Sequence, residues 1–166
     1  MTDQPAYPAH DPFWGVMQQF ASGVVVVTSG STQRRGVTVS AFSLVSRNPP
    51  LVSITLRRSS RCLAMLKREG CFTVSVLSAE QAELARHFAD AHRHHEPPGE
   101  TIWAGLDRLP VLRGALGWLS CEIYQVIGLG DHELLLGSVR SAVSGTGRPL
   151  VRFAGKLYSD TLTNTA

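Results

Sequence analysis

The chain has 166 residues, of which 43% are hydrophobic, and its formal net charge is +3. A chain of this length buries a core without help from disulfides or metals, so we expect one domain over residues 1–166. Its longest apolar runs are only a few residues, far short of the roughly 20 that cross a bilayer. No basic run with interleaved aromatic residues indicates nucleic-acid binding. Composition therefore predicts a globular protein with no membrane and no nucleic-acid partner.

The cysteines and the N-terminus predict a cytoplasmic protein. Cys62, Cys71 and Cys121 are odd in number and lack CxxC spacing, which favours reduced thiols over disulfides or metal ligands. Residues 1–11 are polar and proline-bearing, without the basic and apolar regions of a signal peptide. We expect this segment to be disordered.

A short helix is expected first. Asp11 is a candidate N-cap, Pro12 suits the first helical position, and Gly23 is expected to end the helix. The apolar positions at helical spacing are Phe13, Val16, Met17 and Phe20. They predict one apolar face.

Three strands are expected next. The β-branched run at residues 24–28 predicts a buried strand, and residues 36–46 predict a return strand that bends or ends near Ala41. Residues 48–50 contain two prolines, which cannot donate to a sheet and so stop this strand. Residues 51–56 then form another strand.

The middle of the chain predicts two helices around one strand. The first helix starts at Ser60, turns Leu63 and Leu66 inward with Met65 beside them, and ends at Gly70. A strand follows at residues 71–77. Ser78 with Gln81 forms a capping-box pattern for the second helix. The apolar face of that helix is expected to hold Leu84, Ala85 and Phe88.

Residues 89–105 are polar and predict a long loop. The loop contains His92, His94 and His95, whose spacing suits a metal, but no Cys, Asp or Glu completes a convincing ligand set. We therefore expect solvated histidines and no metal site.

The last third of the chain predicts more strands. Two long ones, at residues 118–127 and 133–144, are joined by residues 128–131, and a final strand at 150–157 is broken by Gly155. Many short strands with three short helices, and no βαβ rhythm, predict a mainly β fold in which a barrel is decorated by helices.

The segment GLGDHELLLG at residues 128–137 begins like a dinucleotide fingerprint. Glu133 stands where the third glycine is required, and a strand follows where a helix is needed to meet a pyrophosphate. Taken alone, the segment favours a β-turn with Asp131 and His132 at its tip.

Two further segments leave a binding role and a structural role open. Ser59, Ser60 and Arg61 open a helix after a strand, which suits either an anion site or an ordinary N-cap beside solvated arginines. Residues 38–42 place small hydroxyl side chains on a strand expected to be buried. They either admit a flat ligand or form the polar outward face of the strand. No Ser-His-Asp or HExxH arrangement was found.

The order of ten short segments resembles the flavin reductase family, the small reductase components of two-component flavin-dependent monooxygenases. The segments are FASGVVVVT (20–28), GVTVSAF (36–42), SRNPPL (46–51), RRSSR (57–61), FTVSVL (72–77), FA (88–89), LPVL (109–112), CE (121–122), GDH (130–132) and FAGK (153–156). The resemblance implies a split β-barrel of Greek-key type, working as a homodimer that binds FMN or FAD.

The resemblance also implies roles for particular residues. Thr38, Val39, Ser40 and Ala41 would line the isoalloxazine, and Ser53, Ile54 and Thr55 would contact the ring or the ribityl chain. Ser59, Ser60 and Arg61 would hold the phosphate, and Phe88 and Ala89 would close over that end. His132 would help to place the nicotinamide of NADH or NADPH, while Asp131 shapes the turn or orients His132.

The implied activity is NAD(P)H:flavin oxidoreduction that supplies reduced flavin to a separate monooxygenase. The alternatives are a relative that keeps flavin for an oxidase or oxygenase reaction, or a non-catalytic flavin- or haem-binding protein. Three positions depart from the family pattern. Glu133 replaces a usual Thr, Ser138 a usual Glu, and Leu157 a usual aromatic, with Tyr158 beside it.

Overall fold

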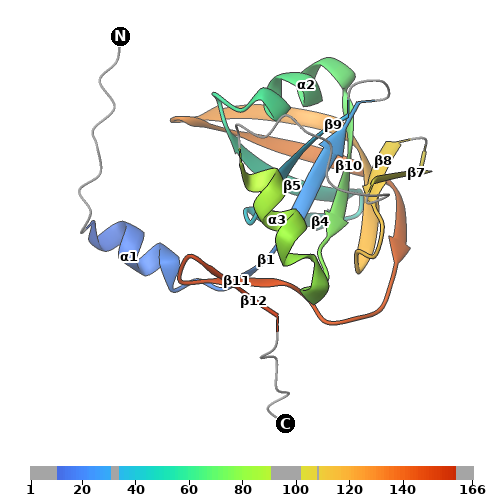
Figure 1. Ribbon diagram of the computed structural model, residues 1–166. Coiled ribbons are helices and arrows are strands. Elements are labelled where there is room, and N and C mark those ends of the chain that lie inside the picture. The colour runs from blue at the N-terminus through green and yellow to red at the C-terminus, as the bar shows by residue number, and fades with distance from the viewer. Residues whose placement is uncertain (1–10, 31–33, 91–101, 108, 160–166) are drawn as a thin grey trace.

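The computed structural model of the chain describes residues 11–30, 34–90, 102–107 and 109–159 (Figure 1). Residues 1–10 of the N-terminus expected to be disordered, and His92, His94 and His95, lie outside the described residues. The helical segments are α1 (Pro12–Gln18), α2 (Arg61–Glu69), the 3₁₀ turn η1 (Ala79–Gln81) and α3 (Ala82–Ala89). The strands are β1 (Ser22–Gly23), β2 (Val25–Ser29), β3 (Arg35–Val39), β4 (Phe42–Arg47), β5 (Pro50–Arg57), β6 (Cys71–Val76), β7 (Ile102–Leu106), β8 (Leu109–Leu112), β9 (Gly117–Leu129), β10 (His132–Ser144), β11 (Val151–Phe153) and β12 (Lys156–Tyr158).

A seven-stranded antiparallel sheet forms the body of the protein, in the order β3-β2-β6-β9-β10-β5-β4. Its two edge strands, β3 and β4, are consecutive in the chain, and only Ser40 and Ala41 separate them. Because so short a link cannot cross an open sheet of seven strands, the sheet curls until its edges meet. The hydrogen bond from the Thr55 N–H to the Ala41 carbonyl, 3.2 Å, marks the closure. The expected β-barrel is therefore confirmed.

The barrel interior is filled by apolar side chains that alternate along its strands. Val52, Ile54 and Leu56 of β5 all point into it, as does Leu135 of β10. Phe72 of β6 is completely buried there. This packing fixes which face of each strand is left for a ligand, because adjacent residues of a strand point to opposite faces.

A second, smaller core lies on the other face of β2. Val25 and Val27 face the barrel interior, whereas Val24 and Val26 pack with Leu77 and with residues of α3, β8 and the β11 region. The run of four valines is therefore buried on both faces, as its β-branched composition predicts.

Helix α2 lies over the barrel interior and has the ends that the sequence predicts. The Ser60 hydroxyl accepts a hydrogen bond from the Leu63 N–H, and Gly70 adopts a left-handed conformation with φ of +71°. Leu63 and Leu66 are buried in the core, as expected. Gln81 likewise accepts a hydrogen bond from the Ser78 N–H, as expected of the predicted capping box.

Three expectations about local structure were wrong. Helix α1 ends at Gln18 and not near Gly23, because Ser22 and Gly23 pair with β11 instead. The predicted loop at 89–105 contains most of β7, which pairs with β8. The last predicted strand is interrupted at Gly155 as expected, but its two parts form a hairpin, β11–β12, in which Ala154 and Gly155 make the turn with positive φ.

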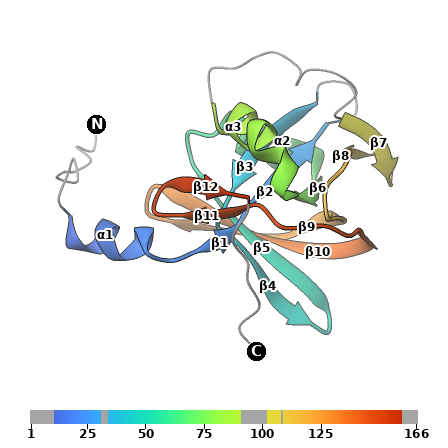
Figure 2. The same cartoon turned by 60° about the horizontal axis from the view of Figure 1, so that its bottom comes forward.

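Two segments project from the barrel. Helix α1 stands away from the body in all three views, and the β4–β5 hairpin extends beyond it in Figure 2. Consistent with this position, α1 buries none of its residues. The apolar face predicted for α1 is therefore exposed in the single chain.

Candidate functional site

The site begins on the outer face of strands β5 and β10. His132 is paired with Arg57, Leu134 with Thr55, and Leu136 with Ser53. Paired residues of antiparallel strands share a face, so His132 stands in one row with Arg57 and the two hydroxyl side chains. Their neighbours on β5 point into the core. The sheet thus separates a packed inner face from an outer face on which polar side chains alternate between strands with Leu134 and Leu136.

The link between β3 and β4 borders this row. The Thr55 N–H donates to the Ala41 carbonyl, which places Ala41 beside the middle of β5. Ala41 is exposed and Ser40 is half-buried. The sheet closure therefore brings together the two short segments, 40–41 and 53–55, that the sequence predicts as neighbours of a flat ring.

Three of the predicted ring-lining residues have their side chains turned elsewhere. Val39 and Ile54 are buried in the barrel interior, so only their backbone could meet a ligand. The Thr38 hydroxyl donates to the Ala85 carbonyl at 2.6 Å and ties α3 to β3. The apolar–polar alternation of residues 51–57 already indicates that Ile54 points into the core, because the apolar residues of the strand share one face.

The turn between β5 and α2 carries the predicted phosphate site. The Ser60 N–H donates to the Arg57 carbonyl at 2.9 Å, which closes the turn, and the Ser60 hydroxyl caps α2. Arg57, Arg58 and Ser59 are all exposed. Guanidinium groups, a hydroxyl and the first N–H groups of a helix are the donors that bind phosphate in proteins. The N-cap role and an anion site are therefore compatible.

Phe88 and Ala89 lie near the end of α3, which packs on β3. A Cβ at Gly36 would lie 2.6 Å from a ring carbon of Phe88, so this ring occupies the space that the glycine leaves. Phe88 also packs against the second core. Phe88 therefore has a packing role in the fold, whereas Ala89 is exposed at the end of the helix.

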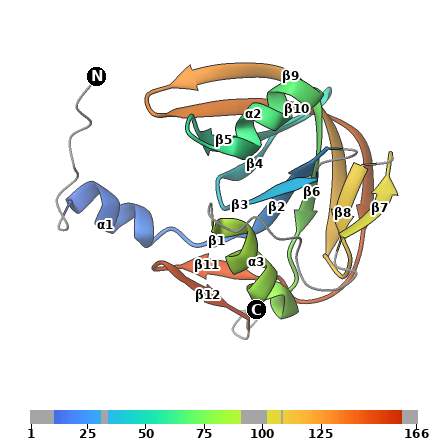
Figure 3. The same cartoon turned by 45° about the horizontal axis from the view of Figure 1, so that its top comes forward.

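Strands β9 and β10 form a long hairpin (Figure 3). His132, the first residue of β10, lies at its tip. Gly130 makes the turn with φ of +57°, and the carboxylate of Asp131 contacts the Nδ1 atom of His132 at 2.7 Å. This hydrogen bond to His132 is the main cause that lowers the pKa of Asp131, and the positive charge of Arg57 adds to it. With Nδ1 engaged, Nε2 remains the imidazole atom for a ligand.

Contacts from two sides fix the hairpin tip. The Arg58 N–H donates to the Asp131 carbonyl at 3.0 Å, and the Arg58 guanidinium lies so close to Gly128 that a Cβ there would be 2.8 Å from it. On the inner face, the Lys67 ammonium of α2 contacts the Glu133 carboxylate at 2.8 Å. No local pattern in the sequence indicates this ion pair, since its partners are 66 residues apart.

Besides Glu133, two residues depart from the family pattern, Ser138 and Leu157, and both lie within regular strands. Ser138 is half-buried within β10, opposite Leu51 and Glu122. Leu157 packs against the second core, whereas Tyr158 is exposed with its ring 6.2 Å from that of Phe153. An aromatic side chain is thus present beside the expected position, on the outside of the β11–β12 hairpin.

A separate cavity of about 550 Å³ was not predicted from the sequence. It is lined by Cys71, Asp107, Leu109, Ser120, Cys121, Glu122 and Arg140. The Asp107 carboxylate accepts hydrogen bonds from the hydroxyls of Ser120 and Ser141, which lower its pKa, and Arg140 pairs with Glu122. Each of these charged groups therefore already has a partner, Asp107 the two hydroxyls and Arg140 the Glu122 carboxylate.

The described part of the chain contains three free cysteines and no group of three or more His, Cys, Asp or Glu side chains that could hold a metal ion. Cys62 and Cys121 are buried, and burial raises the pKa of each thiol to about 12. None of the helices in the described residues is long and apolar enough to cross a membrane.

Comparison with known proteins places this site in a family. The chain is 37% identical over 147 residues to an NADH-dependent FAD reductase of Streptomyces globisporus, covering 84% of this chain and 79% of that one. A structure of the NADH:FAD oxidoreductase of Streptomyces globisporus, in complex with NAD and FAD fragments, superposes with a TM-score of 0.84 at 31% identity. That match covers 94% of this chain and 95% of the other.

A second solved structure, the flavin reductase component of a bacterial two-component tryptophan halogenase, gives a TM-score of 0.83 at 30% identity, with 90% and 98% of the two chains covered. The family model described as "Flavin reductase like domain" matches residues 17–159. The match includes every strand and every predicted site residue, from β1 to β12. The chain therefore belongs to the flavin reductase family.

Proposed function

We propose that this protein is an NAD(P)H-dependent flavin reductase that reduces FMN or FAD and supplies reduced flavin to a separate flavin-dependent monooxygenase. One observation carries the proposal. The outer row of His132, Arg57 and the two hydroxyls leads directly into the arginine-rich turn at residues 57–61. Similarity to proteins whose names describe NADH-dependent flavin reductases, and reductase components of two-component enzymes, supports it.

The residues present fit a flavin. The turn at 57–61 contributes three arginines and two serines and no carboxylate, which suits a phosphate or pyrophosphate. Ser53 and Thr55 offer hydroxyls along the neighbouring strand, and Ala41 offers a small side chain where a ring must approach closely. Val39 and Ile54 would contribute backbone groups only, because their side chains are buried.

For hydride transfer, the protein mainly has to bind and orient the two reactants. A flavin held here supplies the hydride-accepting ring, and NADH or NADPH supplies the hydride. We propose that His132 uses Nε2 to hold the nicotinamide end of the donor while Asp131 fixes the ring orientation through Nδ1. Arg57, on the same face, adds positive charge that favours the phosphates of the donor. Thr38 and Phe88 would support the site through α3, with Ala89 at its rim.

The decisive experiment mixes the purified protein with NADH or NADPH and with FMN or FAD, and follows nicotinamide absorbance. We expect nucleotide consumption well above the flavin-only background. No consumption in any of the four combinations would refute the reductase proposal. A flavin that stays bound and does not exchange would favour the oxidase or oxygenase alternative.

A variant separates the role of His132 from flavin binding. His132→Ala should raise the KM for NADH by about tenfold, the equivalent of one charge-assisted hydrogen bond. Flavin affinity, measured by quenching of flavin fluorescence, should stay within about twofold. Loss of flavin binding with an unchanged KM for NADH would show that the roles have been assigned wrongly.

We further propose that the protein works as a homodimer. Helix α1 exposes Phe13, Trp14, Val16 and Met17, and the edge strand β4 exposes Leu44 and Val45, which is unusual for surfaces that stay in water. Both segments project from the barrel (Figure 2). Light scattering coupled to size exclusion should give twice the chain mass, and Val16→Glu with Leu44→Glu should reduce it. A monomer at micromolar concentration would reject the homodimer.

A cytoplasmic location is also part of the proposal. The support is that all three cysteines are free thiols, which is the usual state of cysteine in a reducing compartment.

A further inference from the structure

The residue after His132 points to the opposite side of the same strand. His132 is paired with Arg57 on the outer face, whereas Glu133 is paired with Leu56, which lies in the barrel core. The Glu133 side chain is only 16% exposed. A carboxylate in such a position is costly unless it is paired.

Its partner is Lys67 of α2. The Lys67 ammonium lies 2.8 Å from the Glu133 carboxylate and is itself about half exposed. The helix that carries Lys67 begins at Ser60, in the turn proposed to bind the flavin phosphate. The ion pair therefore joins the element that would hold one end of the flavin to the strand that carries the histidine proposed to hold the nicotinamide.

We propose that Lys67 and Glu133 are positioning residues, which fix the His132 hairpin relative to the phosphate-binding turn. Neither touches a reacting atom, because Glu133 and His132 face opposite sides of β10. The pair acts together with the contacts of Arg58 on Asp131 and Gly128, which hold the hairpin from the outer side. The inference rests on the proposed function, because it assumes that NADH and flavin meet between these two elements.

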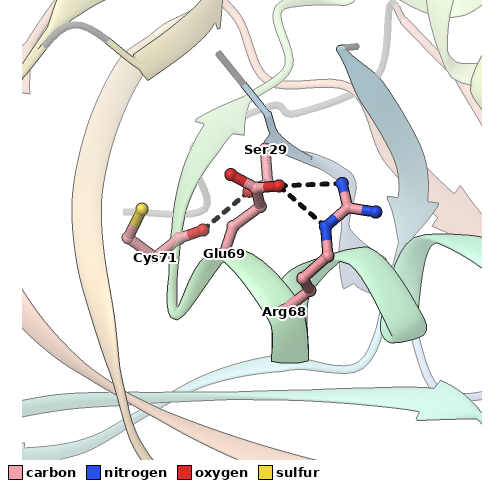
Figure 4. Close-up of polar contacts among 4 residues, drawn as sticks. All are labelled: Ser29, Arg68, Glu69 and Cys71. Carbon is pink, nitrogen blue, oxygen red and sulfur yellow. Dashed lines mark hydrogen bonds and ion pairs between the residues drawn. The ribbon is translucent and has the colours of Figure 1, made fainter. Parts of the chain in front are cut away.

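The same last turn of α2 provides a matched control. Arg68 pairs with the adjacent Glu69 at 2.8 Å, and nearby the Ser29 hydroxyl donates to the Cys71 carbonyl at 2.7 Å (Figure 4). The Arg68–Glu69 pair joins neighbouring residues at the C-terminal end of α2, so its loss leaves the hairpin and the phosphate turn untouched. Glu69→Gln thus removes an ion pair from α2 without loosening His132.

The test compares Glu133→Gln, Lys67→Met, the exchange Lys67→Glu/Glu133→Lys and the control Glu69→Gln. We expect each single change of the pair to raise the KM for NADH by about three- to tenfold, the size of a lost, partly buried ion pair. Flavin affinity and kcat should change less than about twofold. The exchange variant should recover most of the loss, and Glu69→Gln should match the parent protein.

Two readouts do not depend on turnover. Titration of NAD⁺ into the protein should show the same weakening for Glu133→Gln, and the ring signals of His132 in ¹H–¹⁵N spectra should shift or broaden, while Glu69→Gln leaves both unchanged. Combining Glu133→Gln with His132→Ala should give no further rise in KM, because both act through the same imidazole. Additive effects would overturn the inference.

The outcomes separate this inference from the proposed function. If the parent protein consumes NADH and His132→Ala impairs it, but Glu133→Gln and Lys67→Met keep the parental KM, the positioning role is rejected and the reductase proposal stands. If the parent protein consumes no nucleotide, the function itself is refuted. A failure of the exchange variant to recover, in a folded protein, also counts against the pair.

Discussion

The two faces of strand β10 have different roles, one in the packed core and the other at the candidate site. Leu135 points into the barrel and is completely buried, whereas His132 points outward and its side chain is 36% exposed. Interior residues lose contacts with many neighbours when they are shortened, and outer residues lose contacts with few. Changes on the inner face should therefore lower stability, and changes on the outer face should alter binding while the fold persists.

The largest loss of stability is expected at the centre of the interior. Phe72→Ala removes a completely buried ring and should lower the free energy of unfolding by about 3–5 kcal/mol. Urea unfolding followed by tryptophan fluorescence measures this. Tyr124→Ala, at a side chain that is 61% exposed, is the control and should change stability by no more than about 0.5 kcal/mol. Equal effects at both positions would contradict the contrast between the faces.

Adding one methyl group to the inner face should also be harmful. A Cβ at Gly137 of β10 would lie 2.6 Å from the Phe72 ring and 3.2 Å from the Cβ of Cys121. Gly137→Ala should therefore cost about 1–3 kcal/mol through overpacking. The same change combined with Phe72→Leu makes room and should recover part of the loss in thermal unfolding. A neutral Gly137→Ala would mean that the interior tolerates added volume.

Substitutions of Ser60 test whether fold stability and flavin binding can be changed separately at one residue. Ser60→Asp keeps an oxygen that can cap α2, so stability should stay within about 0.5 kcal/mol, because Asp and Ser are similar N-caps. The added negative charge should repel a phosphate and weaken flavin binding by about tenfold or more. Ser60→Ala should instead lose about 1 kcal/mol of stability as a cap is removed. Unchanged flavin affinity in Ser60→Asp would place the phosphate elsewhere.

The smallest effects concern the cysteines. Burial raises the pKa of Cys62 and Cys121 to about 12, from an ordinary value near 9.0. Because these pKa values are raised in the folded state, the thiols favour folding below pH 9, and this contribution is lost as the pH rises toward 12. Folded protein at pH 8 should therefore resist iodoacetamide at both positions.

Cys71 gives the comparison for that experiment. It is half-buried, and burial, followed by the negative charges of Glu69 and Glu122, raises its pKa as well. Mass spectrometry should show slow modification of Cys71 before either buried thiol. Rapid labelling of Cys62 in the folded protein would show that the interior opens more readily than its packing indicates.

Much of the fold could be predicted from local patterns. The four valines at 24–27, the cap at Ser60 and the stop at Gly70 each carry a local physical signal, and the structure confirms them. The strands β7 and β8 were missed because they have only five and four residues and because β7 follows a polar stretch rich in His, Pro and Gly. The break of the last strand at Gly155 was predicted, but the positive φ of Ala154, which helps to fold the two halves into a hairpin, has no signal in the sequence.

For the candidate site, the segments were predictable from the sequence, but the orientation of individual side chains was less so. The resemblance supplied the segments, and the sheet closure brings residues 40–41, 53–55 and 57–61 together with His132. The roles of individual side chains were less accessible. Thr38 donates to α3, and Ile54 points into the core, because strand register and helix packing decide orientation.

Apolar periodicity, helix caps and the order of short motifs are local properties, so the amino-acid sequence was enough to predict a mainly β protein that resembles the flavin reductase family. The outer side of β5 and β10, and the contact of Lys67 with Glu133 across 66 residues, became known from the folded chain. Strand register and long-range ion pairs arise when the sheet closes, and no short stretch of sequence encodes that closure alone.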